Sequence, residues 1–256
     1  MNLDRDDHDD WHTPSSLLDV ADKASLGRQS PTGLIRMEDF VELIPSELMD
    51  ASGAAFYAGR RAFETPSRLY LLDANPGGSC LRQAGETVKW HCNKVLYNEP
   101  DNWSAYRDES WEDATPGTGG IQPRVLTLLE DLHLNPGTVP ASNLVFLHSP
   151  IETLVHGDFD ELAERCWGFH QGVLDRLGTR VILCFGRTTG DWVRMRLDAH
   201  EQVGAFVEET GSRWTSRAYK NADQLTVVVA THPSRADWRA RGTDPTQLVR
   251  EALEKA

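Results

Sequence analysis

Two short polar turns carry the side chains best suited to chemistry in this chain. One is Asp73 to Gly77 (DANPG), and the other is Thr231 to Ser234 (THPS). A carboxylate and an imidazole can take up or release protons near neutral pH, and an amide such as that of Asn75 can orient a water molecule. Asn-Pro-Gly is also a common turn, and a single histidine is more often structural. The two turns therefore predict acid–base chemistry only if the fold brings them together.

Four apolar runs indicate the strands that would do so. They share β-forming composition and end in turn residues, and they cover residues 67–73, 143–148, 180–185 and 225–230. Strands that are apolar on both faces are typical of parallel sheets covered by helices.

Helical patterns alternate with these runs. Apolar residues recur at helical spacing over 121–132, 159–177, 188–197 and 246–253, and two further helices are predicted between Met37 and Phe63. The alternation predicts an α/β fold, a three-layer α/β/α sandwich with a central four-stranded parallel sheet.

In a parallel sheet, ligands bind beyond the carboxyl ends of the strands. Both polar turns follow such ends, as do His148 and Gly186. Asn143 lies at the start of its predicted strand, so it reaches the same site only by a bend or through its side chain.

Several segments, in chain order, resemble motifs of the uracil-DNA glycosylase superfamily. Asp73-Ala74-Asn75-Pro76-Gly77 is similar to the first motif, particularly the Gly-x-Asn-Pro-Gly form of mismatch-specific branches. Residues 228–234 (VVATHPS) are similar to the second motif. Between them, Gly119-Gly120 with the following helix and strand, and then residues 181–186, match intervening segments. The resemblance covers residues 67–78 and 117–240.

This resemblance implies a base-excision site. Asn75 matches the residue that positions water, His232 the donor to the departing base, and Asn143 the amide that contacts the base edge. Ala74, Pro76, Gly77 and Ser234 would complete the base-binding pocket. Breaking an N-glycosidic bond develops negative charge on the base, which such donors stabilise.

Asp73 departs from the family pattern, which usually has glycine there. Its carboxylate could act as a general base, contact an amino group of a cytosine-like base, or cap the next helix. These alternatives stay open at the level of the sequence.

The loop at 233–242 (PSRADWRARG) matches the family segment that fills the gap left by a flipped base. Arg235 and Trp238 are the expected wedges, and Arg239 and Arg241 are expected to bind phosphates. From Gly211 to Arg241, cations exceed anions by four, with Trp214 and Tyr219 interleaved, although the chain as a whole carries a net charge of −13. A basic, aromatic stretch is suited to nucleic acid, but it could equally be an ordinary solvated surface.

Aromatic residues are concentrated between Ser79 and Gly120. Tyr97, Trp103 and Trp111 are candidates for stacking on a base, although most such residues serve as core.

The four cysteines form no Cys-x-x-Cys pair and lack the clustering of the iron–sulfur branches, so no cofactor and no metal is expected. Cys80 and Cys92, with His91, could still meet around a metal, but unpaired cytosolic thiols are favoured.

The length suits one domain, residues 31–256, preceded by a polar arm over residues 1–30. No apolar run could span a bilayer, and the acidic start differs from a signal peptide, so we expect a cytoplasmic monomer without membrane contact.

The leading hypothesis is a monofunctional DNA glycosylase that acts on uracil, a mismatch or a modified cytosine, with phage defence as one possible setting and DNA as its partner. A non-catalytic nucleic-acid sensor on the same fold is the alternative. A nucleotide-binding protein is disfavoured because no glycine-rich phosphate fingerprint follows the first strand.

Overall fold

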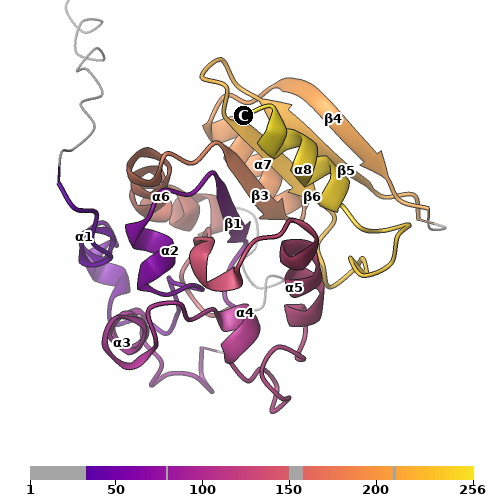
Figure 1. Ribbon diagram of the computed structural model, residues 1–256. Coiled ribbons are helices and arrows are strands. Elements are labelled where there is room, and N and C mark those ends of the chain that lie inside the picture. The colour runs from indigo at the N-terminus through magenta and orange to yellow at the C-terminus, as the bar shows by residue number, and fades with distance from the viewer. Residues whose placement is uncertain (1–32, 79, 150–157, 210–211) are drawn as a thin grey trace, which may run out of the picture. The chain divides into compact units, whose positions relative to one another are not determined.

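Six strands form one sheet in the order β2-β1-β3-β6-β5-β4 within the part of the chain that the structure describes (Figure 1). This computed structural model describes residues 33–78, 80–149, 158–209 and 212–256. The predicted arm over residues 1–30 lies outside them. Gly33–Ala256 forms a single compact unit.

The four predicted parallel strands are present, but the sheet is larger than predicted. β1 (Leu69–Asp73), β2 (Ala141–Asn143), β3 (Val181–Phe185) and β6 (Thr226–Ala230) pair in parallel. β5 (Thr215–Lys220) then pairs antiparallel to β6, and β4 (Glu201–Val207) antiparallel to β5. The prediction of a four-stranded sheet is therefore wrong in strand number, because a hairpin with a bulge between Gln202 and Gly204 extends it.

The position of β2 also corrects the sequence prediction. The strand ends at Asn143 instead of beginning there, and Asn143 pairs in register with Asp73 on β1. Residues 144–148 continue the apolar run, but they leave the strand while remaining close to the protein interior. Asn143 consequently lies at a strand end, where the site is expected.

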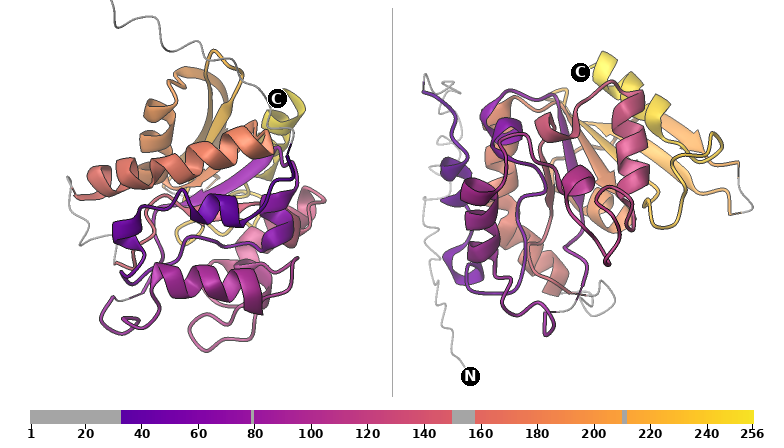
Figure 2. Two further views of the ribbon diagram at one scale, coloured as in Figure 1. Left: turned by 90° about the vertical axis from the view of Figure 1, so that its left-hand side faces the viewer. Right: turned by 60° about the horizontal axis from the view of Figure 1, so that its bottom comes forward.

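Helices cover both faces of the sheet, and alternate strand residues face each layer. On one face, the Tyr70 hydroxyl contacts Nδ1 of His170 on α6 (Asp158–Leu177) at 2.8 Å. On the same face, α7 (Arg187–Arg196) packs so closely that a Cβ on Gly190 would meet Val229. The opposite face holds α8 (Thr246–Glu254), which contacts β3 to β6. Figure 2 shows, in its left view, α6 in front of the strands and α8 behind them.

The segment before β1 forms short turns in place of the two predicted helices. It contains α1 (Glu38–Val41), η1 (Ser46–Leu48) and α2 (Arg60–Glu64). Its apolar spacing reflects an aromatic cluster in which the Phe56 ring lies 4.9 Å from Phe63 and 5.4 Å from Phe169 on α6. Burial of such rings contributes stability without requiring a continuous helix.

The chain between β1 and β2 is mostly irregular. It contains α3 (Val88–Asn93), the π-helical turn η2 (Lys94–Asn98), α4 (Ala105–Asp108), α5 (Gln122–Asp131) and the 3-10 turn η3 (Pro136–Thr138). Among these, α5 matches its prediction from the sequence, as do α6, α7 and α8 to within a few residues. Among the described residues, the structure contains no helix with the length and apolar character needed to cross a membrane.

Candidate functional site

The carboxyl ends of the parallel strands open into one cavity of about 1390 Å³. The residues at its base are Asp73, Asn75, Asn143 and His232, called the floor below, and all four line the cavity. They come from the ends of β1, β2 and β6, which the parallel register brings to the same edge of the sheet. The expectation that the two polar turns meet is therefore confirmed.

Asp73 and His232 are in direct contact, although 159 positions separate them in sequence. Nε2 of His232 lies 3.3 Å from Oδ1 and 3.4 Å from Oδ2 of Asp73. The side chain of His232 is 28% exposed and that of Asp73 is 16% exposed, so each remains accessible from the cavity. The Asp73 carboxylate also accepts a hydrogen bond from the backbone N–H of Ala74 at 2.7 Å, which fixes its orientation.

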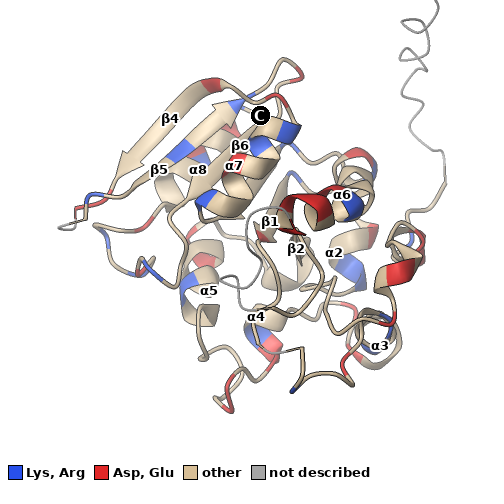
Figure 3. Cartoon of the chain, turned by 180° about the vertical axis from the view of Figure 1, so that it is seen from behind, with Lys and Arg blue, Asp and Glu red and all other residues tan. Residues whose placement is uncertain are grey.

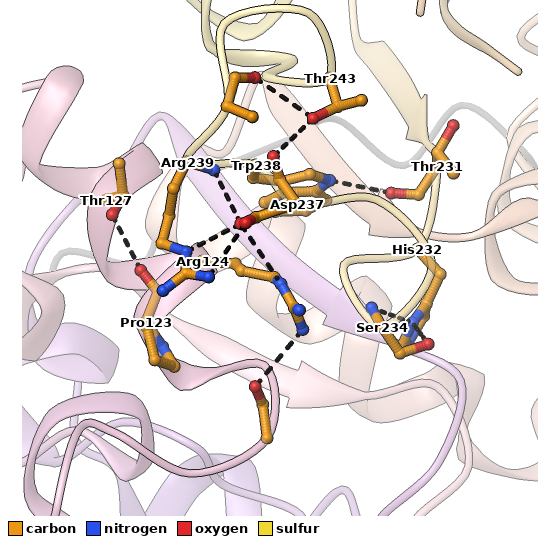
Figure 4. A network of polar contacts seen from close by, with 12 residues as sticks. Pro123, Arg124, Thr127, Thr231, His232, Ser234, Asp237, Trp238, Arg239 and Thr243 are labelled. Carbon is orange, nitrogen blue, oxygen red and sulfur yellow. Dashed lines mark hydrogen bonds and ion pairs between the residues drawn. The ribbon is translucent and has the colours of Figure 1, made fainter. Parts of the chain in front are cut away.

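Ser234 determines which nitrogen of His232 carries the proton. Its backbone N–H donates to Nδ1 of His232 at 3.0 Å, and its hydroxyl lies 2.7 Å from the same atom (Figure 4). Because a backbone N–H can only donate, Nδ1 must present a lone pair. The neutral ring therefore carries its proton on Nε2, which points to Asp73. Ser234 was predicted to bind the base. In the structure it hydrogen-bonds to the imidazole of His232.

Asn75 is held through its amide nitrogen. Nδ2 donates to the carbonyl of Pro76 at 2.9 Å and to that of Ser149. With both amide hydrogens engaged, the carbonyl oxygen Oδ1 is the atom that can accept a hydrogen bond from a ligand or water. This is the orientation required to position a nucleophilic water.

Asn143 presents a hydrogen-bond donor to the cavity, whereas Asn75 presents an acceptor. Its side chain is buried, with 2% of the residue exposed, and lies beside the Tyr57 phenol, but Nδ2 makes no hydrogen bond of good geometry within the described part of the structure. A buried donor without a partner costs free energy unless a ligand satisfies it. Since Asn143 lines the cavity, this donor is suited to an acceptor on a bound molecule.

The remaining residues of the first turn lie around these groups. Ala74 and Gly77 line the cavity, whereas Pro76 is buried beside it and contributes its carbonyl to Asn75. Gly77 has open space at its Cβ position, so a side chain there would project freely.

Gly186 forms the junction between β3 and α7. Its φ is +87°, and a Cβ at this position would lie 3.3 Å from Cβ of His232. Both constraints favour glycine, because L-residues rarely adopt positive φ and because the side chain of His232 occupies the space that a Cβ would need.

Aromatic rings cover one side of the floor. Tyr57, Tyr106 and Trp111 line the cavity, with ring centroids 5.7 to 6.2 Å apart. Burial raises the pKa of both tyrosines, so their phenols stay protonated. Tyr57 was not predicted from the sequence, because its segment (AAFYAG) has no motif that sets it apart.

The other aromatic candidates lie elsewhere. Trp103 is buried in the core, and Tyr97 is exposed but does not line the cavity. Trp111 is therefore the one of the three predicted candidates that the structure brings to the site.

The loop after His232 differs from its prediction at Trp238. This ring is buried, packs against Phe185 at 5.2 Å, and donates from its indole nitrogen to the Thr231 carbonyl at 3.0 Å (Figure 4). A side chain so placed supports the turn that carries His232 and is not positioned as a wedge. Of the two predicted wedges, Arg235 does line the cavity, and it is exposed.

The other two arginines of this loop lie away from the cavity. Arg239 is paired with Asp237 at 2.8 Å, which, together with Arg124 at 3.5 Å, lowers the pKa of Asp237 to about 2. Arg241 is exposed, and neither Arg239 nor Arg241 lines the cavity.

Two walls of opposite charge rise from the floor. The arginine wall comprises Arg187, Arg213, Arg217 and Arg235, on the side of β3, β6 and β5. The glutamate wall comprises Glu86, Glu109 and Glu112, in the segment around α3 and α4. Figure 3 shows basic residues on β5 and acidic residues in the loop that follows α4.

The glutamate wall also contains two histidines. The Ser52 hydroxyl donates to the Gln83 carbonyl at 2.8 Å, so its oxygen accepts from Nδ1 of His148 at 3.0 Å. His91 is buried with Nδ1 unpartnered among the described residues, and burial together with nearby Lys94 and His148 lowers its pKa to about 3. Burial also lowers the pKa of His148, so both imidazoles are neutral at pH 7.

The described residues contain no group of side chains able to hold a metal ion. Cys80 is exposed whereas Cys92 is buried. Burial raises the pKa of the Cys92 thiol to about 12, which disfavours the thiolate that metal binding needs.

Comparison of the chain with models of protein families finds no match, and comparison with curated proteins finds none either.

Proposed function

We propose that the protein is a monofunctional DNA glycosylase that hydrolyses the N-glycosidic bond of a base flipped into the cavity. The observation that carries this proposal is the contact between Asp73 and His232, with the imidazole held in one tautomer by Ser234. A carboxylate and an N–H donor at the base of a cavity are the groups that this hydrolysis requires.

The floor residues have separate roles in the reaction. A water bound to Oδ1 of Asn75 forms a bond to C1′ of the sugar while the C1′–N bond breaks and its electron pair leaves with the base. Asp73 accepts the proton released by the water. The base departs as an anion, which Nε2–H of His232 stabilises by a hydrogen bond, and it then takes up a proton from solvent.

The contact between Asp73 and His232 is compatible with this change of partner. At 3.3 Å it is longer than the usual charge-assisted hydrogen bond. Little hydrogen-bond energy is therefore lost when the Nε2–H group donates to the departing base instead of to Asp73. The buried Nδ2 of Asn143 supplies a second donor to the base edge. Tyr57 and Trp111 offer faces against which a flat base can stack.

The experiment is a base-excision assay. Oligonucleotides carrying uracil, a uracil–guanine mismatch or modified cytosines are incubated with the protein, and abasic sites are cleaved with alkali. Strand scission with the native protein, lost in Asn75→Ala and His232→Ala, is the expected result. Activity on modified cytosines of the kind found in phage DNA would place the enzyme in phage defence.

The same assay separates the alternative. Binding to DNA without scission across the whole panel would favour a non-catalytic sensor and overturn the proposed hydrolysis.

A further inference from the structure

The hairpin of β4 and β5 places an exposed indole at the rim of the cavity. Trp214 lines the cavity and is 38% exposed, in contrast to the buried Trp238. Its position is set by the backbone, because its carbonyl accepts a hydrogen bond from the N–H of Glu208 at 2.9 Å. The backbone of Arg217 is also held in place, because this residue of β5 pairs with Ala205 on β4 and with Val229 on β6.

The cations beside this indole are available to a ligand. In the described parts of the chain, Arg213, Arg217 and Arg235 form no ion pair with a carboxylate, and all three line the cavity. On the opposite wall, by contrast, Lys94 is neutralised by Glu109 at 2.6 Å and by Glu99 at 3.7 Å. The positive potential of the cavity is therefore concentrated on the hairpin side.

We propose that this side binds a single-stranded nucleic acid. The phosphates follow Arg213, Arg217 and Arg235, and Trp214 stacks on a base next to the nucleotide that enters the cavity. Alternating cations and exposed aromatic rings bind single strands in this manner. The inference rests on the proposed function only in placing nucleic acid at this cavity.

The size of the cavity and the charge of its walls bear on which form of nucleic acid binds, and the charge favours a single strand over a duplex. The cavity, about 1390 Å³, exceeds the 300 to 1,000 Å³ or so of most small-ligand sites, so it can admit more than one nucleotide. A second backbone, however, would approach Glu86 and Glu112 on the opposite wall of a chain with net charge −13. Repulsion between like charges opposes that approach.

Fluorescence anisotropy with a labelled oligonucleotide of ordinary bases tests this proposal. The native protein is expected to bind the single strand at least tenfold more tightly than the duplex of the same sequence. Arg213→Ala/Arg217→Ala should reduce the slope of log K against log salt by about 1.4, because each phosphate contact on a single strand contributes about 0.7. Trp214→Ala should weaken binding about tenfold, whereas Trp214→Tyr should retain most of it.

Matched variants control for charge and ring loss. Arg61→Ala/Arg180→Ala removes the same charge from exposed positions outside the cavity, and Tyr97→Ala removes an exposed ring outside it. Equal effects in control and test variants, or tighter binding of the duplex, would overturn the proposal. Because the oligonucleotide contains no base to excise, the outcome is independent of glycosylase activity.

Discussion

The two walls of the cavity differ in how the chain builds them. The arginine wall lies on strand β5, on the residues just before it and on the turns that end β3 and β6, and backbone hydrogen bonds or strand pairing fix Arg217 and Arg235. The glutamate wall lies on short helices and loops, where side-chain pairs such as Lys94 with Glu109 hold the arrangement. The hairpin side therefore presents cations that remain available to a ligand, whereas on the other wall Lys94 is paired with Glu109 and with Glu99, and Glu86 and Glu112 stay exposed.

The largest expected effect separates the floor from both walls. Asn75→Ala and His232→Ala should each slow base excision by about 10²- to 10³-fold, because they remove water positioning or the donor to the departing base. Binding of an ordinary single strand should change less than about threefold. Single-turnover rates and anisotropy on the same variants measure the two properties.

Asn93→Ala and His200→Ala are matched controls, since both residues are exposed and lie outside the cavity. A parallel loss of binding and excision in the floor variants would show that floor and walls form one functional unit.

A second prediction concerns acid, because two buried histidines, His91 beside the glutamate wall and His170 on α6, have lowered pKa values. Burial is the main cause that lowers the pKa of His91 on this wall to about 3 and that of His170 on α6 to about 4. The unfolded chain, with histidine pKa near 6.5, then binds more protons than the folded protein at intermediate pH. The free energy of unfolding should therefore fall as pH drops from about 6.5 to 4, by the order of 3 kcal/mol per histidine.

Urea unfolding at pH 7.5 and at pH 5 measures this dependence. His170→Gln and His91→Gln should each reduce the loss, and exposed His200→Gln should leave it unchanged. A pH-independent midpoint in the native protein would contradict the assignment of neutral buried imidazoles.

The third prediction concerns Gly186, which directly precedes Arg187 of the arginine wall. Alanine there would strain a backbone with φ of +87° and bring Cβ to 3.3 Å from His232. We expect Gly186→Ala to cost about 1–2 kcal/mol of stability and to slow excision by displacing the imidazole. Gly85→Ala, where nothing lies within 4 Å of the added Cβ, is the control in both unfolding and kinetic measurements. Equal effects of the two substitutions would argue against a tight fit at Gly186.

The smallest expected effect comes from removing negative charge from the glutamate wall. Glu86→Gln/Glu112→Gln removes two exposed carboxylates, which should tighten binding of nucleic acid about threefold and favour the duplex most. Anisotropy at low salt, where screening is weakest, is the suitable measurement. Unchanged duplex affinity would mean that the glutamate wall does not select against a second strand.

The parallel core was predictable from sequence because its strands are apolar on both faces and end in recognisable turns. The hairpin was not, since residues 201–207 and 215–220 are largely exposed or alternate with polar side chains and no buried run marks them. Asn143 was assigned to the wrong end of its strand because an apolar run of six residues does not reveal where pairing stops.

The site shows the same division. That Asn75, Asp73 and His232 meet at one edge of the sheet could be predicted because each stands at the end of a strand or in the short turn after it. Trp238 was misplaced because sequence does not show which way a ring in an irregular loop points, and here Phe185 and the Thr231 carbonyl hold it inside. Tyr57 and Trp214 reach the cavity through contacts that have no local signal in the chain.

The bulge between Gln202 and Gly204 has a consequence for how copies of the protein meet. β4 is the outermost strand of the hairpin side, so its free backbone groups could pair with a strand from another molecule. The bulge interrupts the regular spacing of those groups, and Leu248 of α8 packs against the chain at Gly204. An incoming strand would find no uninterrupted row of donors and acceptors, so this edge, next to the strand that carries Arg217, is protected against growth into a longer intermolecular sheet.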